Sequence, residues 1–287
     1  MHSLQTWAAA HKEKLLVLFV LSIFLGCSIV LQGYSIVQVV NLVFIEQETF
    51  SSTFVFLFLL VVAILLRLFT QFWMNRIGGT LAERVKISVR QTLLQHWTQN
   101  AMEAQMTTQT GEKVTLLIDT VDQLESYYRE YIPQIIKTTI VPLIILIAVF
   151  MTHTTSGWIM LVTVPFIPIT YIIIGMQTQK KSEEQLVAMN KFSGKFLDLL
   201  QGLQTIRLFG QSKKQEQVLE ASNKGFMERT LSVLKIAFAS TLFIEFITTL
   251  GVGLVALEIG FKMIVFQSLA FAPAFFVLTM APEFYNS

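Results

Sequence analysis

The sequence predicts an all-α membrane protein with six transmembrane helices and two long cytoplasmic helical hairpins. Three observations lead to this prediction. Of the 287 residues, 53% are hydrophobic and only 14% are charged, whereas a soluble domain has about 25% charged residues. Six stretches are long and apolar enough to cross a bilayer. The two longest connections between these stretches are positively charged and amphipathic.

The predicted spans follow from length and hydropathy. A helix that crosses the membrane needs about 20 mainly apolar residues. Six ranges meet this requirement after the charged N-terminal segment 1–14: 15–45, 53–74, 132–151, 158–177, 236–257 and 263–281. We expect kinks in the third and fourth spans, because proline removes a helical hydrogen bond. The prolines concerned are Pro133, Pro142, Pro165 and Pro168.

The connections differ in length and charge. Three are short: an acidic loop at 46–48, the segment 152–157, and about five residues around Glu258. The other two, about 75–131 and 178–235, are much longer. Of the 21 lysines and arginines, all but Arg67 and Lys262 lie before the first span or in or beside these long connections. The positive-inside rule therefore predicts a multi-pass protein with both termini and both long connections in the cytoplasm.

Both long connections have the periodicity of amphipathic helices. In the first, apolar residues recur at steps of four: Leu81, Val85, Val89, Leu93 and Trp97. In the second, a similar face comprises Leu186, Met189, Phe192, Phe196, Leu199 and Leu203. Neither connection has a strong helix stop at the membrane edge. We expect transmembrane helices that continue far into the cytoplasm, turn, and return as the next span.

This plan resembles the transmembrane domain of type I ABC exporters, and the resemblance covers nearly all of 15–287. Residues 108–128 (TQTGEKVTLLIDTVDQLESYY) resemble the family's first coupling helix and its surroundings, and residues 200–226 resemble the second. Residues 234–246 and 271–285 are similar, more narrowly, to the CydD half of the CydDC exporters.

The resemblance implies that the two hairpin tips dock on nucleotide-binding domains. At the first tip it selects Gly111, Glu112 and Asp119. At the second tip Leu208 and Phe209 would supply apolar contact, inside a polar rim of Arg207, Lys213 and Lys214. The alternative is an ordinary solvated helix turn.

The sequence shows no nucleotide-binding motif of its own. A P-loop needs Gly-x-x-x-x-Gly-Lys-Ser/Thr, and the single Gly-Lys pair, Gly194-Lys195, lacks the earlier glycine and the Ser/Thr. We therefore expect this chain alone to catalyse nothing, with ATP and magnesium bound by a nucleotide-binding domain outside it. No metal site is expected, because the four histidines are scattered.

Polar residues within the spans are candidates for a transport path, because a charge there costs about 3 kcal/mol. Arg67 and Glu245 lie at comparable depths, and either an ion pair or a shared substrate site is predicted. Gln71 extends the polar face of Arg67 by one turn. A second stripe on the first span comprises Tyr34, Gln38 and Asn41. The alternative is that all these groups hold helices together.

The resemblance implies a heterodimer with a CydC-like partner in a bacterial cell membrane, exporting cysteine and glutathione and supporting cytochrome bd assembly. Haem is a competing substrate. No histidine lies in a predicted span, so a haem ligand would be Met, Tyr, Cys27 or a partner residue. Two further classes are an ion-coupled secondary transporter, which does not need the long hairpins, and a membrane assembly scaffold, which leaves Arg67 unexplained.

Overall fold

The computed structural model describes residues 12–47, 50–99 and 115–286, and these residues form helices and turns without a strand. The elements of the first half are α2 (Lys12–Val40), the π-helical turn η1 (Asn41–Ile45), α3 (Phe50–Gln99), η2 (Leu116–Thr120), α6 (Leu124–Ser126), η3 (Tyr127–Tyr131) and α7 (Ile132–Thr152). Those of the second half are α8 (Thr154–Thr163), α9 (Phe166–Gln201), α10 (Leu203–Leu208), α11 (Ser212–Gly260), η4 (Phe261–Val265) and α12 (Phe271–Asn286). The chain divides into two compact units, Leu161–Gly253 and the remainder.

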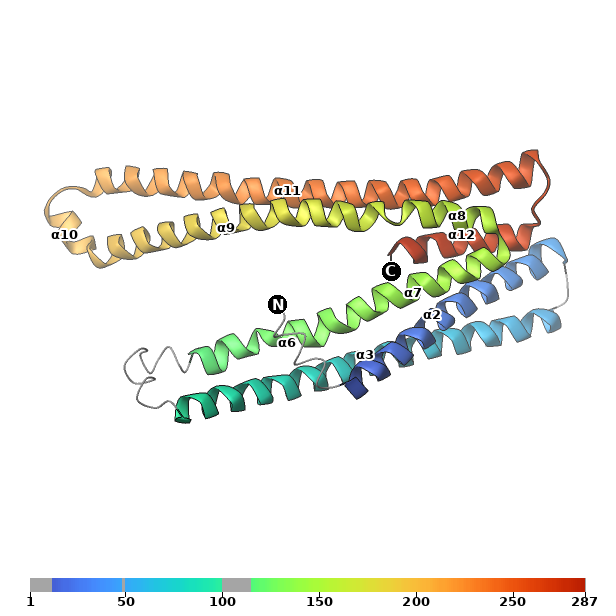
Figure 1. The fold of residues 1–287 in the computed structure, drawn as a ribbon. Helices are drawn as coiled ribbons and strands as arrows, with labels where there is room; N and C mark the ends of the chain where they lie inside the picture. Colours follow the sequence, from blue (N-terminus) through green and yellow to red (C-terminus); the bar gives the residue numbers. More distant parts are fainter. Residues whose placement is uncertain (1–11, 48–49, 100–114, 287) are drawn as a thin grey trace. The chain divides into compact units, whose positions relative to one another are not determined.

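The long helices confirm the predicted extension of spans into hairpins (Figure 1). Helix α3 runs for 50 residues without a break and α11 for 49. At 1.5 Å per residue α3 is about 75 Å long, more than twice the roughly 30 Å hydrocarbon core of a bilayer. Five helices of the described chain are long and apolar enough to cross a membrane.

The predicted boundary of the sixth span is wrong. Residues 263–265 still belong to the helical continuation of the fifth long helix, and the chain turns only at 266–270, where Gln267 has a φ of 46°. Helix α12 begins at Phe271 and has 16 residues. Hydropathy missed the break because apolar residues lie on both sides of it. The sixth span itself stays a prediction.

The chain turns within the predicted connection at 152–157, but the turn is much shorter than expected. Only His153 separates α7 from α8, in an extended conformation with φ −152° and ψ 100°. Its backbone N–H donates to the carbonyl of Val149 at 2.7 Å. A proline break does occur between α8 and α9, at Val164 and Pro165, whereas α7 continues through Pro142.

In the larger unit α2 packs along α3 and α7, and α12 packs on α2 and α7. Small residues permit this approach, as in other helix pairs that lack a hydrophobic driving force in lipid. A Cβ on Gly26 would overlap the side chain of Ile144, and one on Gly33 would overlap Met280. Three buried serines of α2 donate their hydroxyls to carbonyls one turn back, so each of these hydroxyls has a partner: Ser22, Ser28 and Ser35.

The first hairpin has a small core where α3 meets η3. Leu81, Val85 and Tyr128 are fully buried there, which confirms the predicted apolar face at these α3 positions. Above this core the Lys86 ammonium lies 3.1 Å from Asp122 and 2.6 Å from Glu125. The hairpin is therefore closed by both apolar packing and ion pairs.

The second unit consists of the α9–α10–α11 hairpin. Helix α9 has no buried residue, and Leu186 of its predicted apolar face is 55% exposed. The main contacts across the hairpin are the Phe192–Phe226 ring stack at 5.9 Å and the hydrogen bond from Gln185 to Thr230. Two helices alone bury only a narrow strip of each, so most of this face lacks a partner within the unit.

Candidate functional site

Arg67 of α3 lies at the meeting point of three helices. Its guanidinium lies 3.1 Å from one carboxylate oxygen of Glu283 on α12 and 3.4 Å from the other. It also donates to the side-chain carbonyl of Gln32 on α2 at 3.1 Å. A two-point contact of this kind is the strong form of the arginine–carboxylate pair. Arg67 is thus held by protein groups.

Glu283 differs from the predicted partner of Arg67, which was Glu245 because the two residues lie at comparable depths in the predicted spans. Glu245 belongs to the other unit, and its pairing with Arg67 stays a prediction. Sequence reasoning missed Glu283 because the predicted sixth span ended two residues before it. The signal was present: Glu283 follows an apolar run, and the observed start of α12 at Phe271 places it inside the helix.

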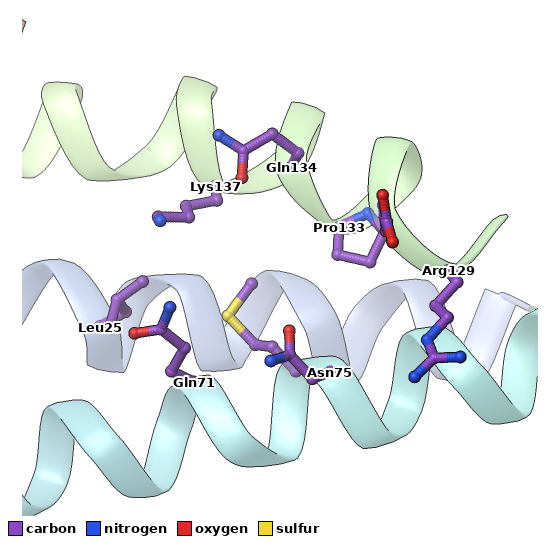
Figure 2. Close-up of a pocket in the computed structure, with 9 residues that line it drawn as sticks. Leu25, Gln71, Asn75, Arg129, Pro133, Gln134 and Lys137 are labelled. Atoms are coloured by element: carbon purple, nitrogen blue, oxygen red, sulfur yellow. The ribbon is translucent and has the colours of Figure 1, made fainter. Parts of the chain in front are cut away.

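The polar face of α3 continues from Arg67 into a cavity of about 320 Å³. Gln71 and Asn75 follow at intervals of four residues and line it, so all three share one face of the helix. Figure 2 shows these amides on α3 facing Gln134 and Lys137 on α7. The other lining residues are Leu25, Met74 and Pro133, which are apolar, and Arg129 and Glu130.

The charges of the cavity are not equally satisfied. Arg129 forms an ion pair with Glu125 at 3.0 Å, one turn earlier. Lys137 is half-buried, and the described part of the chain offers it no hydrogen bond or ion pair; the same holds for Glu130, which is exposed. The cavity therefore presents one unpaired cation, one unpaired carboxylate and the three amides of Gln71, Asn75 and Gln134.

A glycine sets the spacing at the edge of this cavity. A Cβ on Gly78 would overlap the backbone carbonyl oxygen of Arg129 and lie 3.1 Å from Pro133. Because the first of these neighbours is backbone, it cannot yield by a change of rotamer. Gly78 was not selected from the sequence, and the adjacent Gly79 has open space around it.

The predicted stripe on the first span does not join the cavity. The Tyr34 ring packs on Phe56 with centroids 6.4 Å apart. Asn41 donates to the Glu46 carboxylate at 2.8 Å across the η1 turn. The Gln38 side chain is half-buried. Tyr34 and Asn41 thus have local structural partners, and a role in transport for the three stays a prediction.

A second polar cluster, here called the turn cluster, lies at the far end of α7 and comprises His153, Thr155, Ser156, Glu258 and Lys262. The Lys262 ammonium lies 3.1 Å from Glu258 and donates to Thr155 at 2.7 Å. It also contacts His153 Nε2 at 3.1 Å. The Ser156 hydroxyl donates to Glu258 at 2.7 Å and lies 2.8 Å from His153 Nδ1.

These directions determine the state of His153. An ammonium has no acceptor and a carboxylate no donor, so Nε2 accepts from Lys262 and the Ser156 hydroxyl gives its proton to Glu258. With Nε2 accepting from an ammonium the imidazole is neutral, and the Ser156 hydroxyl and backbone N–H lie 2.8 and 3.4 Å from Nδ1. Burial lowers the pKa of His153, with Lys262 acting in the same direction and Glu258 opposing it. The buried Glu258 Oε1 has no hydrogen bond, although it lies 3.1 Å from the Lys262 ammonium.

The residues selected for coupling lie in two places. Gly111 and Glu112 are outside the described residues, and Asp119 lies in η2 with an exposed side chain. At the second tip Leu208 and Phe209 are 84% and 74% exposed. Arg207, Lys213 and Lys214 are exposed around them. The tip of the second hairpin therefore presents apolar side chains within a basic rim.

Comparison with known proteins identifies the family. Residues 15–284 match the description "ABC transporter transmembrane region". The chain belongs to this family. Its helices follow the type I exporter plan, in which long hairpins join the spans, and among the described residues no group of three or more His, Cys, Asp or Glu side chains is placed to hold a metal.

Three curated relatives show which ABC transporters this domain resembles. It is 27% identical over 268 residues to the glutathione/L-cysteine transport system ATP-binding/permease protein CydD of Escherichia coli, covering 91% of this chain and 46% of that protein. Identity is 34% over 183 residues to CydD of Haemophilus influenzae, covering 61% of this chain and 31% of the relative. Identity to CydC of Bacillus subtilis is 31% over 176 residues, covering 61% of this chain and 31% of that protein. The chain spans about half the length of these relatives or less, and it is CydD-like.

Proposed function

We propose that this chain forms, with a CydC-like subunit, the membrane pathway of an ATP-driven exporter of glutathione and cysteine. The observation that carries the proposal is the similarity, over 91% of the chain, to a protein named for glutathione and cysteine transport. The unpaired polar cavity between α3 and α7 supports it, because a transport path for a small polar molecule needs hydrogen-bonding groups that the protein itself does not satisfy.

Energy would come from nucleotide-binding domains that bind ATP and magnesium. The exposed Leu208 and Phe209 suit a partner groove, since large apolar side chains on a hairpin tip gain free energy when covered. The expected setting is the bacterial cell membrane with both termini in the cytoplasm, and the exported thiols would support cytochrome bd assembly.

Uptake into inverted membrane vesicles tests this function. The full-length protein and its native partner are produced together, and radiolabelled glutathione, cysteine and haem are supplied with and without ATP. ATP-dependent accumulation of either thiol is expected. The control is a variant of the ATP-binding motif in both subunits. Accumulation of haem without thiol, or ATP-independent uptake driven by an ion gradient, would overturn the proposal.

A further inference from the structure

Three charged residues line the cavity between α3 and α7, and two of them, Glu130 and Lys137, lack a partner among the described residues. Lys137 lies half-buried, about five residues into α7, without an anion within the described residues. A cation placed at a membrane boundary costs free energy unless it is paired or hydrated. Arg67, by contrast, has such partners in Glu283 and Gln32.

The opposite charge in the cavity is too far away to pair with Lys137. Glu130 precedes Lys137 by seven residues, which places it on the same side of the helix about 10 Å along the axis. Arg129 is engaged by Glu125. The cavity thus presents a cation and a carboxylate separated by the length of a small molecule.

The remaining lining fits a ligand that is polar at its ends. Gln71 and Asn75 can each donate and accept a hydrogen bond, while Leu25, Met74 and Pro133 give an apolar surface. A volume of about 320 Å³ is at the small end of ligand pockets. Two opposite charges with amides between them complement a zwitterion that has an amide or a thiol in its middle.

We propose that this cavity is the recognition site for the exported thiol, with Lys137 binding a substrate carboxylate and Glu130 its ammonium group. Gln71 and Asn75 hydrogen-bond to the atoms between. The inference rests on the proposed function and specifies its substrate class as zwitterions of the length of glutathione, whose ammonium group and one carboxylate lie at opposite ends of the molecule. Arg67 is a neighbour of the site and not a member, because its charge is already matched.

Direct binding tests the site independently of transport. The full-length protein with its partner is placed in nanodiscs, and the dissociation constants of S-methylglutathione and of its diethyl ester are measured. We expect Lys137→Gln to weaken S-methylglutathione about tenfold, which corresponds to the loss of one charge-assisted contact of about 1.4 kcal/mol. Lys137→Arg keeps most of the affinity, and Lys224→Gln, an exposed lysine of α11, leaves it unchanged.

The ester makes the test specific for the carboxylate. In the native protein the ester should bind more weakly than the acid, and in Lys137→Gln this difference should disappear, since the two changes remove the same contact. Equal weakening of acid and ester by Lys137→Gln, or no binding of the acid to the native protein, would overturn the proposal. If Lys137→Gln does not assemble, Gln71→Ala and Glu130→Gln must each lower the affinity, and unchanged affinity in either overturns the proposal.

Transport separates this inference from the proposed function. If the native protein binds S-methylglutathione through Lys137 but accumulates no thiol, the proposed site is supported and the proposed transport function is refuted. If Lys137→Gln transports the thiol with the same KM as the native protein, the proposed transport function is supported and the proposed site is refuted.

Discussion

A lysine lies near each end of α7, and the two lysines differ in whether they have hydrogen-bonding or ionic partners. At the turn between α7 and α8, Lys262 contacts Glu258, Thr155 and His153, and every member of the turn cluster has a partner. Near the start of α7, Lys137 borders a cavity and has none in the described chain. A polar group with partners contributes to the fold, whereas one without them is positioned for something the fold does not contain.

The difference has a geometric cause. At the first of these ends a single residue reverses the chain, so side chains of α8 and η4 are brought within hydrogen-bonding distance of His153. At the other end, α3 and η3 meet through the backbone contact at Gly78, and the side chains beyond that contact line an open space. Close contact of backbones thus coexists with unsatisfied side chains.

The largest effect is expected from Gly78→Ala. The added methyl group overlaps the carbonyl of Arg129, and because backbone must move, the cost should be about 3 kcal/mol, the upper part of the range for overpacking. The thermal midpoint of the complex in nanodiscs measures it. Gly79→Ala is the matched control, since its methyl group enters open space and alanine favours a helix. Equal midpoints for the two variants would contradict the close contact.

The next prediction compares the two lysines directly. Lys262→Met leaves the Glu258 carboxylate, which is mostly buried, without its counter-charge, and we expect a loss of about 2 kcal/mol. Lys137→Met removes a charge without a partner, so stability should stay the same or rise while binding of S-methylglutathione falls. Thermal midpoints and dissociation constants of both variants test this. A greater loss of stability in Lys137→Met would reverse the assignment of structural and functional roles.

The smallest effect concerns acid. Burial lowers the pKa of His153, so the unfolded chain takes up a proton at a higher pH than the folded one does. The stability that neutral His153 contributes is therefore complete above its ordinary pKa of about 6.5 and is lost as pH falls through the folded pKa. Protonation also sets the imidazolium against Lys262, although Glu258 opposes this effect.

His153→Gln tests that dependence. The thermal midpoint of the native complex is compared with that of the variant between pH 8 and pH 5. We expect a smaller acid-induced decrease in the variant, because glutamine does not titrate. Parallel curves would show that His153 does not contribute to the pH dependence. Thr205→Val, in α10 at the hairpin tip, serves as a control without a titratable change.

Much of the fold was predictable because it depends on local patterns. The apolar runs and the steps of four identified the long helices, and α3 confirms that a span continues into its hairpin. The turn at 266–270 was not predictable from hydropathy, since Phe266 and Leu269 are as apolar as the spans. The connection at 152–157 was expected to be longer than the single residue His153, because its polar residues Thr154 and Ser156 lie in α8.

The site was predictable only in part. Charge within a span was sufficient to select Arg67 and, one turn on, Gln71. Lys137 was counted among the basic residues of the hairpin, because a sequence shows a cation but not whether an anion lies beside it. Glu283 and Gly78 acquire their roles only through neighbours on other helices.

Hydropathy, helical periodicity and the distribution of lysine and arginine are properties of the linear chain, and they were enough to establish a helical membrane domain with long hairpins. Which carboxylate pairs with Arg67, whether Lys137 has a partner, and where backbones touch depend on residues far apart in the sequence: 216 positions for Arg67 and Glu283, and 51 for Gly78 and Arg129. Such pairs are decided by how helices pack, since a hydrogen bond or an ion pair needs contact within about 3 Å, and no local pattern encodes that distance.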